Sequence, residues 1–160
     1  MPSAGRPFTE QLVIDLLSQG IYVAPVTLHT GVSSQEKFEH PYPEEFIVPS
    51  ATASLTNFVR YNGGRIIAVG TTVARAIESS VDGNGTVMAR SGWTNRVISS
   101  DAPAEIVHGI ITGFHPKDST HAELLEGIVG RAVFDYAHAI ALDHGYMMHE
   151  FGDSCLMFAS

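Results

Sequence analysis

Residues 65–79 read RIIAVGTTVARAIES, and this stretch indicates the class of fold. Its first part, residues 65–70, is a continuous apolar run of the kind that forms a strand buried on both faces. A helical pattern begins at Thr71, directly after Gly70. A buried strand that opens straight into a helix is typical of an α/β layer structure.

The rest of the chain continues this alternation of strands and helices. Apolar and β-branched runs predict strands at residues 21–28, 44–48, 65–70, 86–92, 95–100, 106–114 and on both sides of Gly152. Helical spacing of apolar residues predicts helices at residues 9–20, 50–64, 71–80, 119–130 and 131–145. Since no linker or repeat interrupts the pattern, we predict one α/β domain over residues 1–160, with a mixed β-sheet flanked by helices.

Composition narrows the class of protein. The 160 residues are 44% hydrophobic and 16% charged, which is enough for one domain with a core. The net charge of −8 argues mildly against a nucleic-acid partner, because the surface as a whole repels phosphates. Cys155 is the single cysteine, so we expect a buried, inert thiol and no internal disulfide.

The sequence favours a soluble, reducing, cytoplasmic setting without a membrane partner. No apolar stretch approaches the length of about 20 residues that a membrane span needs. The N-terminal residues lack the basic start and apolar middle of a signal peptide.

Polar residues gather at three corners where a predicted strand ends. In chain order they are Thr27 and His29, then Gly70, Thr71 and Thr72, then His115, Ser119 and Thr120. In open α/β sheets, ligands bind beyond the carboxyl ends of strands, and helix N-termini attract anionic groups. We therefore expect these corners to form the rim of a pocket.

Each corner also has a purely structural interpretation. Threonine and serine cap helices in most proteins, and a lone histidine is more often structural than catalytic. Arg75 and Glu78, three residues apart, fit an exposed pair on one helix. The eight histidines include no pair with the spacing of a helical zinc site, and we expect no metal.

Seven segments match one family in order and spacing, from Pro2 to nearly the end of the chain. They are PSAGRPFTEQL, VTLHTG, EHPYPEE, RIIAVGTTVARAIES, GWTN, ITGFHPKDSTHAELLEGIVGR and GYMMHEFGDSCLMF. Together they resemble the S-adenosylmethionine:tRNA ribosyltransferase-isomerases of queuosine biosynthesis. GTTVARAIES and the pair GFHPKDST and FGDS are the most specific of these motifs.

The resemblance implies a fold and an activity. Family proteins are longer, and the matching stretch is their C-terminal half, which is part of a larger domain. The N-terminal half and an inserted β domain have no counterpart here. The implied reaction transfers the ribosyl portion of S-adenosylmethionine to a 7-deazaguanine base in tRNA, with tRNA bound through the full-length protein. We expect apolar surface that the other half would cover to cause association, most simply into a homodimer.

The resemblance also implies a set of site residues. Histidine suits proton transfer because its ordinary pKa is about 6.5, so His115 and His29 are the candidate acid and base. The candidates for cofactor binding are Gly70, Thr71, Thr72 and Arg75 for an anionic group, and Glu45 and Asp153 for ribose hydroxyls or the sulfonium.

The sequence departs from the family pattern at four places near the expected site. Arg6-Pro7 replaces a Leu-His pair, residues 32–35 replace a glycine-containing loop, Pro43 replaces a histidine, and Gly113 replaces an asparagine. These changes favour a divergent member. The alternatives are a small-molecule binding module and, less favoured, a metal-dependent hydrolase that would use His115, His149 and Asp153.

Overall fold

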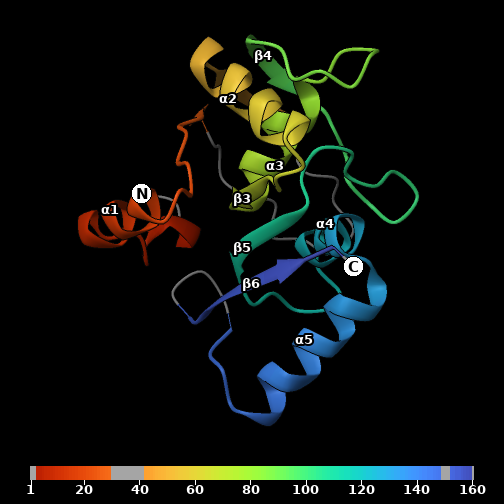
Figure 1. The fold of residues 1–160 in the computed structure, drawn as a ribbon. Coiled ribbons are helices and arrows are strands. Elements are labelled where there is room, and N and C mark those ends of the chain that lie inside the picture. Colours follow the sequence, from red (N-terminus) through yellow and green to blue (C-terminus); the bar gives the residue numbers. More distant parts are fainter. Residues whose placement is uncertain (1–2, 30–41, 149–151, 160) are drawn as a thin grey trace.

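The strands of the protein form two three-stranded sheets (Figure 1). The computed structural model describes residues 3–29, 42–148 and 152–159. One sheet is antiparallel, in the order β1-β2-β4, and contains β1 (Thr27–His29), β2 (Glu44–Val48) and β4 (Arg90–Thr94). The other, in the order β3-β5-β6, contains β3 (Ile67–Val69), β5 (Gly109–Gly113) and β6 (Ser154–Phe158). In it, β3 and β5 are parallel and β6 is antiparallel, so the predicted α/β class with a mixed sheet is confirmed.

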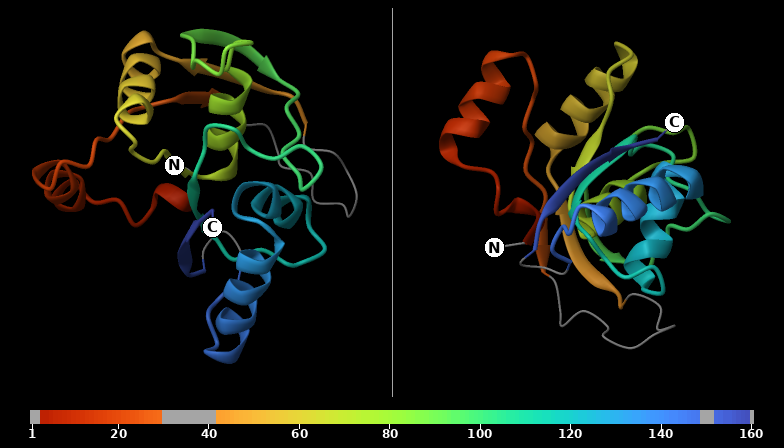
Figure 2. Two further views of the ribbon diagram at one scale, coloured as in Figure 1. Left: turned by 45° about the vertical axis from the view of Figure 1, so that its right-hand side comes forward. Right: turned by 90° about the horizontal axis from the view of Figure 1, so that it is seen from below.

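The helices pack around and between these sheets. They are the 3-10 helix η1 (Ser3–Gly5) and the α-helices α1 (Glu10–Ser18), α2 (Ser50–Tyr61), α3 (Thr71–Ser79), α4 (Thr120–Val129) and α5 (Arg131–Asp143). Helix α3 contacts strands of both sheets, and α4 contacts β5 and β6 (Figure 2). Helix α1 projects from the rest of the molecule, and none of its residues is buried (Figure 1). No helix in the described part of the chain is long and apolar enough to cross a membrane.

Local sequence signals account for the helix ends. The Thr9 side chain accepts a hydrogen bond of 3.1 Å from the amide of Leu12 and so caps α1. Ser119 caps α4 in the same way, through the amide of Ala122. Gly130 has a φ of 83°, a conformation that favours glycine, and it separates α4 from α5.

Several predicted strands are shorter or absent. The strand predicted at residues 21–28 is found only at Thr27–His29. Pro25 lacks an amide donor, and its carbonyl accepts a hydrogen bond from the hydroxyl of Thr52 on α2. Residues 95–100 form no strand, since Ser99 and Ala102 exchange backbone hydrogen bonds in a turn. In the tail, β6 follows Gly152, and the strand expected before it is not found at residues 145–148; residues 149–151 lie outside the described part.

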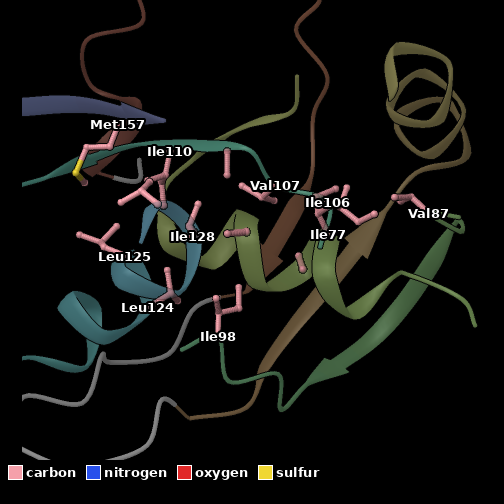
Figure 3. Packing of buried hydrophobic residues seen from close by; sticks show 14 of the residues in the cluster. Ile77, Val87, Ile98, Ile106, Val107, Ile110, Leu124, Leu125, Ile128 and Met157 are labelled. Atoms are coloured by element: carbon pink, nitrogen blue, oxygen red, sulfur yellow. The ribbon is translucent and has the colours of Figure 1, made fainter. Parts of the chain in front are cut away.

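The hydrophobic core lies where α3, β5 and α4 meet (Figure 3). Ile110 on β5 and Leu125 on α4 are almost completely buried, and Ile77 contributes from α3. Gly127 allows α4 to approach the loop before β5, because a Cβ there would lie 2.6 Å from the backbone nitrogen of Ser99. The side chain of Ile110 on β5 is thus covered by α3 and α4.

We expect Leu125→Ala to lower the free energy of unfolding by about 3 kcal/mol, since it leaves a cavity in a tightly packed core. Leu142→Ala on α5 is the matched control; Leu142 is 61% exposed, so its change should stay below about 0.5 kcal/mol. Chemical denaturation of both variants gives the comparison. Equal losses would contradict the placement of the core.

Candidate functional site

The carboxyl ends of β3 and β5 lie at the same edge of their sheet, because these strands are parallel and pair Val69 with Ile111. Strand β6 runs the opposite way, so its first residue, Ser154, pairs with Gly113 at this edge. We call this the β3-β5 edge. The sequence candidates that follow or precede these strand ends are Gly70, Thr71, Thr72, His115 and Asp153.

Gly70 turns the chain from β3 into α3. Its φ of 96° favours glycine, and its amide donates to the carbonyl of Ile111 at 2.9 Å. A Cβ on Gly70 would lie 3.6 Å from the side chain of Ala4, which is buried in η1. The segment that contains Ala4 therefore reaches the start of α3, and the divergent Arg6-Pro7 pair follows it directly. The helix N-terminus brings a partial positive charge to the edge.

His115 lies just beyond β5 and is half-buried. Its ring stacks on that of His121, with centroids 4.5 Å apart and an angle of 11° between the planes. Its Nε2 lies 3.4 Å from the hydroxyl of Thr112. These contacts orient the imidazole, which is one requirement for a group that transfers protons.

Asp153 closes the turn that leads into β6. Its carboxylate accepts a 2.8 Å hydrogen bond from the amide of Met147, and its own amide donates to the Met147 carbonyl. The side chain is exposed at the β3-β5 edge. One carboxylate oxygen is therefore engaged in the turn, which fixes the position of the group.

Arg75 on α3 is buried and makes four hydrogen bonds. Its Nη1 contacts the Glu44 carboxylate at 2.6 Å. Its Nη2 donates to the carbonyls of Tyr42 and Thr94, and its Nε donates to that of Arg96. Burial lowers the pKa of the Arg75 guanidinium, against the effect of Glu44. With these bonds, Arg75 attaches α3 to β2 and β4.

Glu44 joins this arrangement to the first turn of α3. Its carboxylate accepts a hydrogen bond from the Thr72 side chain as well as from Arg75. Burial raises the pKa of the Glu44 carboxyl, although both of these partners act to lower it. The contact between Glu44 and Thr72 connects the β1-β2-β4 sheet with the helix that begins at the β3-β5 edge.

The interpretation of Arg75 and Glu78 as an exposed pair is wrong, because both side chains are buried and have other partners. The Glu78 carboxylate accepts hydrogen bonds of 2.8–3.0 Å from the amides of Glu105, Ile106 and Val107. It thereby satisfies three backbone donors before β5. The polar face of α3 is turned inward, which the spacing of charges on the helix does not reveal.

His29 and Glu45 lie on the other sheet, opposite each other in its register. Both are exposed, on the face turned away from α3. The structure therefore places them across the β1-β2-β4 sheet from Glu44 and does not bring them beside His115. Pro43 precedes β2 and is exposed, while residues 32–35 lie outside the described residues.

A pocket of about 450 Å³ lies between α2 and residues 20–26, and β3 and α3 also line it, with Val73 from the first turn of α3. Its lining is mostly apolar and includes Tyr22, Phe58 and Ile66. The volume falls in the range of small-molecule sites.

Comparison with known proteins identifies the family of this chain. The model of the family described as "Queuosine biosynthesis protein" matches residues 1–157. The chain belongs to this queuosine biosynthesis family. The chain is 36% identical to the S-adenosylmethionine:tRNA ribosyltransferase-isomerase of Caldanaerobacter subterraneus and 38% identical to that of Heliobacterium modesticaldum, in each case over 98% of this chain and 48% of the relative. The crystal structure of the S-adenosylmethionine tRNA ribosyltransferase from Thermotoga maritima matches with a TM-score of 0.79 at 30% identity, over 96% of this chain and 50% of that one.

This member of the queuosine biosynthesis family thus spans about half the length of the curated relatives that it matches. The half that it spans contains both the β3-β5 edge and the Arg75–Glu44 contact. Sequence reasoning chose Glu45 and missed Glu44. Side chains alternate between the two faces of β2, and Glu44 shares a face with the buried Phe46 and Val48. This spacing in the sequence could have identified Glu44 as the inward-facing glutamate.

The metal-hydrolase hypothesis involves His115, His149 and Asp153, and Cys155 is the single thiol of the chain. Among residues 3–29, 42–148 and 152–159, no three potential metal ligands of the His, Cys, Asp or Glu type come together. His149, which the hydrolase hypothesis requires, lies outside the described residues. Burial raises the pKa of the Cys155 thiol to about 11, and its Sγ contacts the Thr112 carbonyl at 3.5 Å. Cys155 is half-buried and not fully buried as expected, and the raised pKa of its thiol disfavours the reactive thiolate.

We expect Arg75→Met to lower the free energy of unfolding by about 3 kcal/mol or more, because it leaves the Glu44 carboxylate buried without its charge partner. The double variant Arg75→Met with Glu44→Met should recover part of this loss, since it removes the unpaired charge. Lys117→Met is the control: Lys117 pairs with Asp135 at the surface, where the two side chains are 47% and 41% exposed, and its loss should be much smaller. Thermal unfolding of the variants measures the difference. A loss in the double variant as large as that in Arg75→Met would contradict this account.

Proposed function

We propose that this chain forms part of an S-adenosylmethionine:tRNA ribosyltransferase-isomerase of queuosine biosynthesis and contributes to its S-adenosylmethionine site. The observation that carries the proposal is that Thr72, His115 and Asp153 all lie beyond strand ends at the β3-β5 edge. A helix N-terminus, an oriented imidazole and a carboxylate are brought there from three separate parts of the chain. The names of the relatives support the same activity.

The residues at this edge suit the parts of S-adenosylmethionine. The start of α3, with Gly70, Thr71 and Thr72, offers amides, the Thr71 hydroxyl and a partial positive charge to the methionine carboxylate, while the Thr72 hydroxyl donates to Glu44 and holds this turn in place. Asp153 offers a carboxylate to the ribose hydroxyls or the sulfonium. His115 transfers a proton, either from the carbon beside the sulfonium or to the departing adenine.

The other candidate residues take different roles in this proposal. Arg75 acts as a positioning residue, because its hydrogen-bonding groups hold Glu44, which in turn holds Thr72. His29 and Glu45 lie on the far face of the β1-β2-β4 sheet, so we assign them to contacts with the RNA rather than with S-adenosylmethionine.

Transfer-RNA is the proposed second substrate, and the cytoplasm is the proposed location. The net charge of −8 gives this chain little general attraction for phosphates. The basic surface for the RNA backbone is therefore expected in the half of the relatives that this chain does not span.

The pocket beside α2 favours one alternative, a small-molecule binding module without catalysis. Its lining is largely apolar, with few polar groups to orient a charged ligand. Binding of S-adenosylmethionine that depends on Thr72 and His115 separates the two functions, because neither residue lines this pocket.

We expect S-adenosylmethionine to bind the chain in titration calorimetry. Thr72→Ala and His115→Ala should each weaken this binding about tenfold, since the first releases the start of α3 from Glu44 and the second removes a proposed polar contact with the ligand. His144→Ala is the matched control, because His144 is exposed at the end of α5. Full-strength binding by both Thr72→Ala and His115→Ala would place the ligand elsewhere and contradict the proposal.

We also propose that the chain forms a homodimer through α1. Leu12, Ile14 and Leu17 are exposed on this helix, which buries none of its own residues. Ile14→Glu should shift the molar mass measured by light scattering toward that of a monomer. Leu142→Glu on α5, a comparably exposed apolar position, should leave it unchanged. A monomer at high concentration without any substitution would refute the dimer.

A further inference from the structure

A second imidazole, that of His121, lies against the ring of His115. His115 follows the end of β5, and His121 lies in the first turn of α4, two residues after the cap Ser119. The two rings are nearly parallel, with an angle of 11° and centroids 4.5 Å apart, and both side chains are half-buried. A turn brings them together, closed by the 3.1 Å hydrogen bond from the Ser119 amide to the Pro116 carbonyl. We call His115 and His121 the histidine pair.

The structure changes which two histidines meet at the β3-β5 edge. The sequence favoured His115 and His29 as acid and base, but His29 pairs with Glu45 on the β1-β2-β4 sheet. His121 is instead the imidazole that contacts His115. Two residues six apart, on either side of a turn, share no helical or strand period, so the sequence pattern does not reveal this contact.

A stacked pair of imidazoles holds one proton more readily than two. Each imidazolium disfavours a second positive charge beside it, so the two protons bind in separate steps. The start of α4 acts in the same direction, because a helix N-terminus has a partial positive charge. Ser119 fixes the position of this helix end through its hydrogen bond with the amide of Ala122.

The groups around the pair come from the turn before α4, from α4 and α5, and from β6. The Lys117 ammonium is bound to the carboxylate of Asp135 on α5. His138 and Cys155 line a small cavity together with His115. Burial lowers the pKa of His138 and raises the pKa of the Cys155 thiol to about 11, so both are neutral at neutral pH. The remaining carboxylates near the pair belong to Asp118, Glu123 and Asp153, and residues 149–151 lie outside the described part.

These surroundings favour one proton on the pair, because the carboxylates stabilise a single positive charge and the repulsion between the rings opposes a second. We propose that His115 and His121 together carry out both proton transfers of the proposed reaction, one as the base and the other as the acid. Two neighbouring groups in different protonation states provide both functions at one pH. The inference rests on the proposed function and assigns a further residue, His121, to its site.

The two transfers balance within the pair. The neutral imidazole takes the proton from the carbon beside the sulfonium, and the electron pair of the broken C–H bond stays on that carbon. The imidazolium gives its proton to adenine as the bond between ribose and adenine breaks, and the electron pair of that bond leaves with adenine. The pair therefore holds one proton before the two transfers and one proton after them.

Nuclear magnetic resonance of the 160-residue chain with labelled histidines tests whether the pair shares a proton. The ring signals are assigned by their loss in His115→Ala and in His121→Phe. From about pH 5 to about pH 8, we expect the signals of both rings to report two protonation steps, separated by about one pH unit or more. His121→Phe keeps a flat ring against His115 without a titratable nitrogen, so His115 should then titrate in a single step.

His144→Phe is the matched control, since it makes the same change at an exposed histidine at the end of α5 and should leave both steps in place. S-adenosylmethionine is then added to the labelled chain. We expect nuclear Overhauser contacts from the ligand to the rings of both His115 and His121, whereas a His121 that only supports His115 would show none. Circular dichroism confirms that the variants are folded.

The outcomes separate this inference from the proposed function. A single step for His115 in the unmodified chain, or two steps retained in His121→Phe, overturns the shared proton. Ligand contacts with His115 alone overturn the role of His121 and leave the proposed function standing. If S-adenosylmethionine fails to bind in calorimetry, the proposed function and this inference both fail, even where two steps are observed. Two steps that merge in His121→Phe, together with ligand contacts to both rings, support the inference.

Discussion

The buried guanidinium of Arg75 is the constraint on which the rest of the structure depends. A charge in the interior must be paired and hydrogen-bonded, and Arg75 meets this requirement with the Glu44 carboxylate and three carbonyls. These acceptors belong to β2, β4 and the segments beside them, whereas Arg75 belongs to α3. Satisfying one charge therefore aligns a helix with a sheet that lies far from it in sequence. Glu78 plays a similar part on the same helix, because its carboxylate accepts three amides that precede β5.

This alignment connects the β3-β5 edge of one sheet with β2 of the other sheet. Thr72 belongs to the β3-β5 edge and also contacts Glu44, and Glu45 is the next residue of β2. A shift of α3 would move the start of the helix relative to β2. The ion pair of Arg75 and Glu44 thus holds the proposed cofactor site in a fixed position relative to the β1-β2-β4 sheet. An enzyme that joins a nucleoside fragment to a particular base requires such a fixed relation.

Membership of the queuosine biosynthesis family agrees with the proposed function. The length and the net charge of the chain limit how much of that function it can carry. The chain spans about half of its relatives, and it contains the β3-β5 edge but carries a net negative charge. Recognition of the RNA backbone and recognition of a base make different physical demands, the first for cations and the second for stacking surfaces and directed hydrogen bonds. In the proposed function, the cations for the RNA backbone come from the part of the relatives that this chain does not span.

The sequence by itself determined the local elements, the α/β class and the family. An apolar, β-branched run identifies β5 and an apolar period of 3.6 residues identifies α4, and Thr9 and Ser119 cap their helices as their side chains predict. Only the tertiary structure decided which strands share a sheet, which of two consecutive glutamates turns inward, and that Trp93 lies beside Glu45. These features come from strand register and from pairing between residues that are distant in sequence. A local pattern specifies the two faces of a strand but not what lies opposite them, because that depends on where the chain returns.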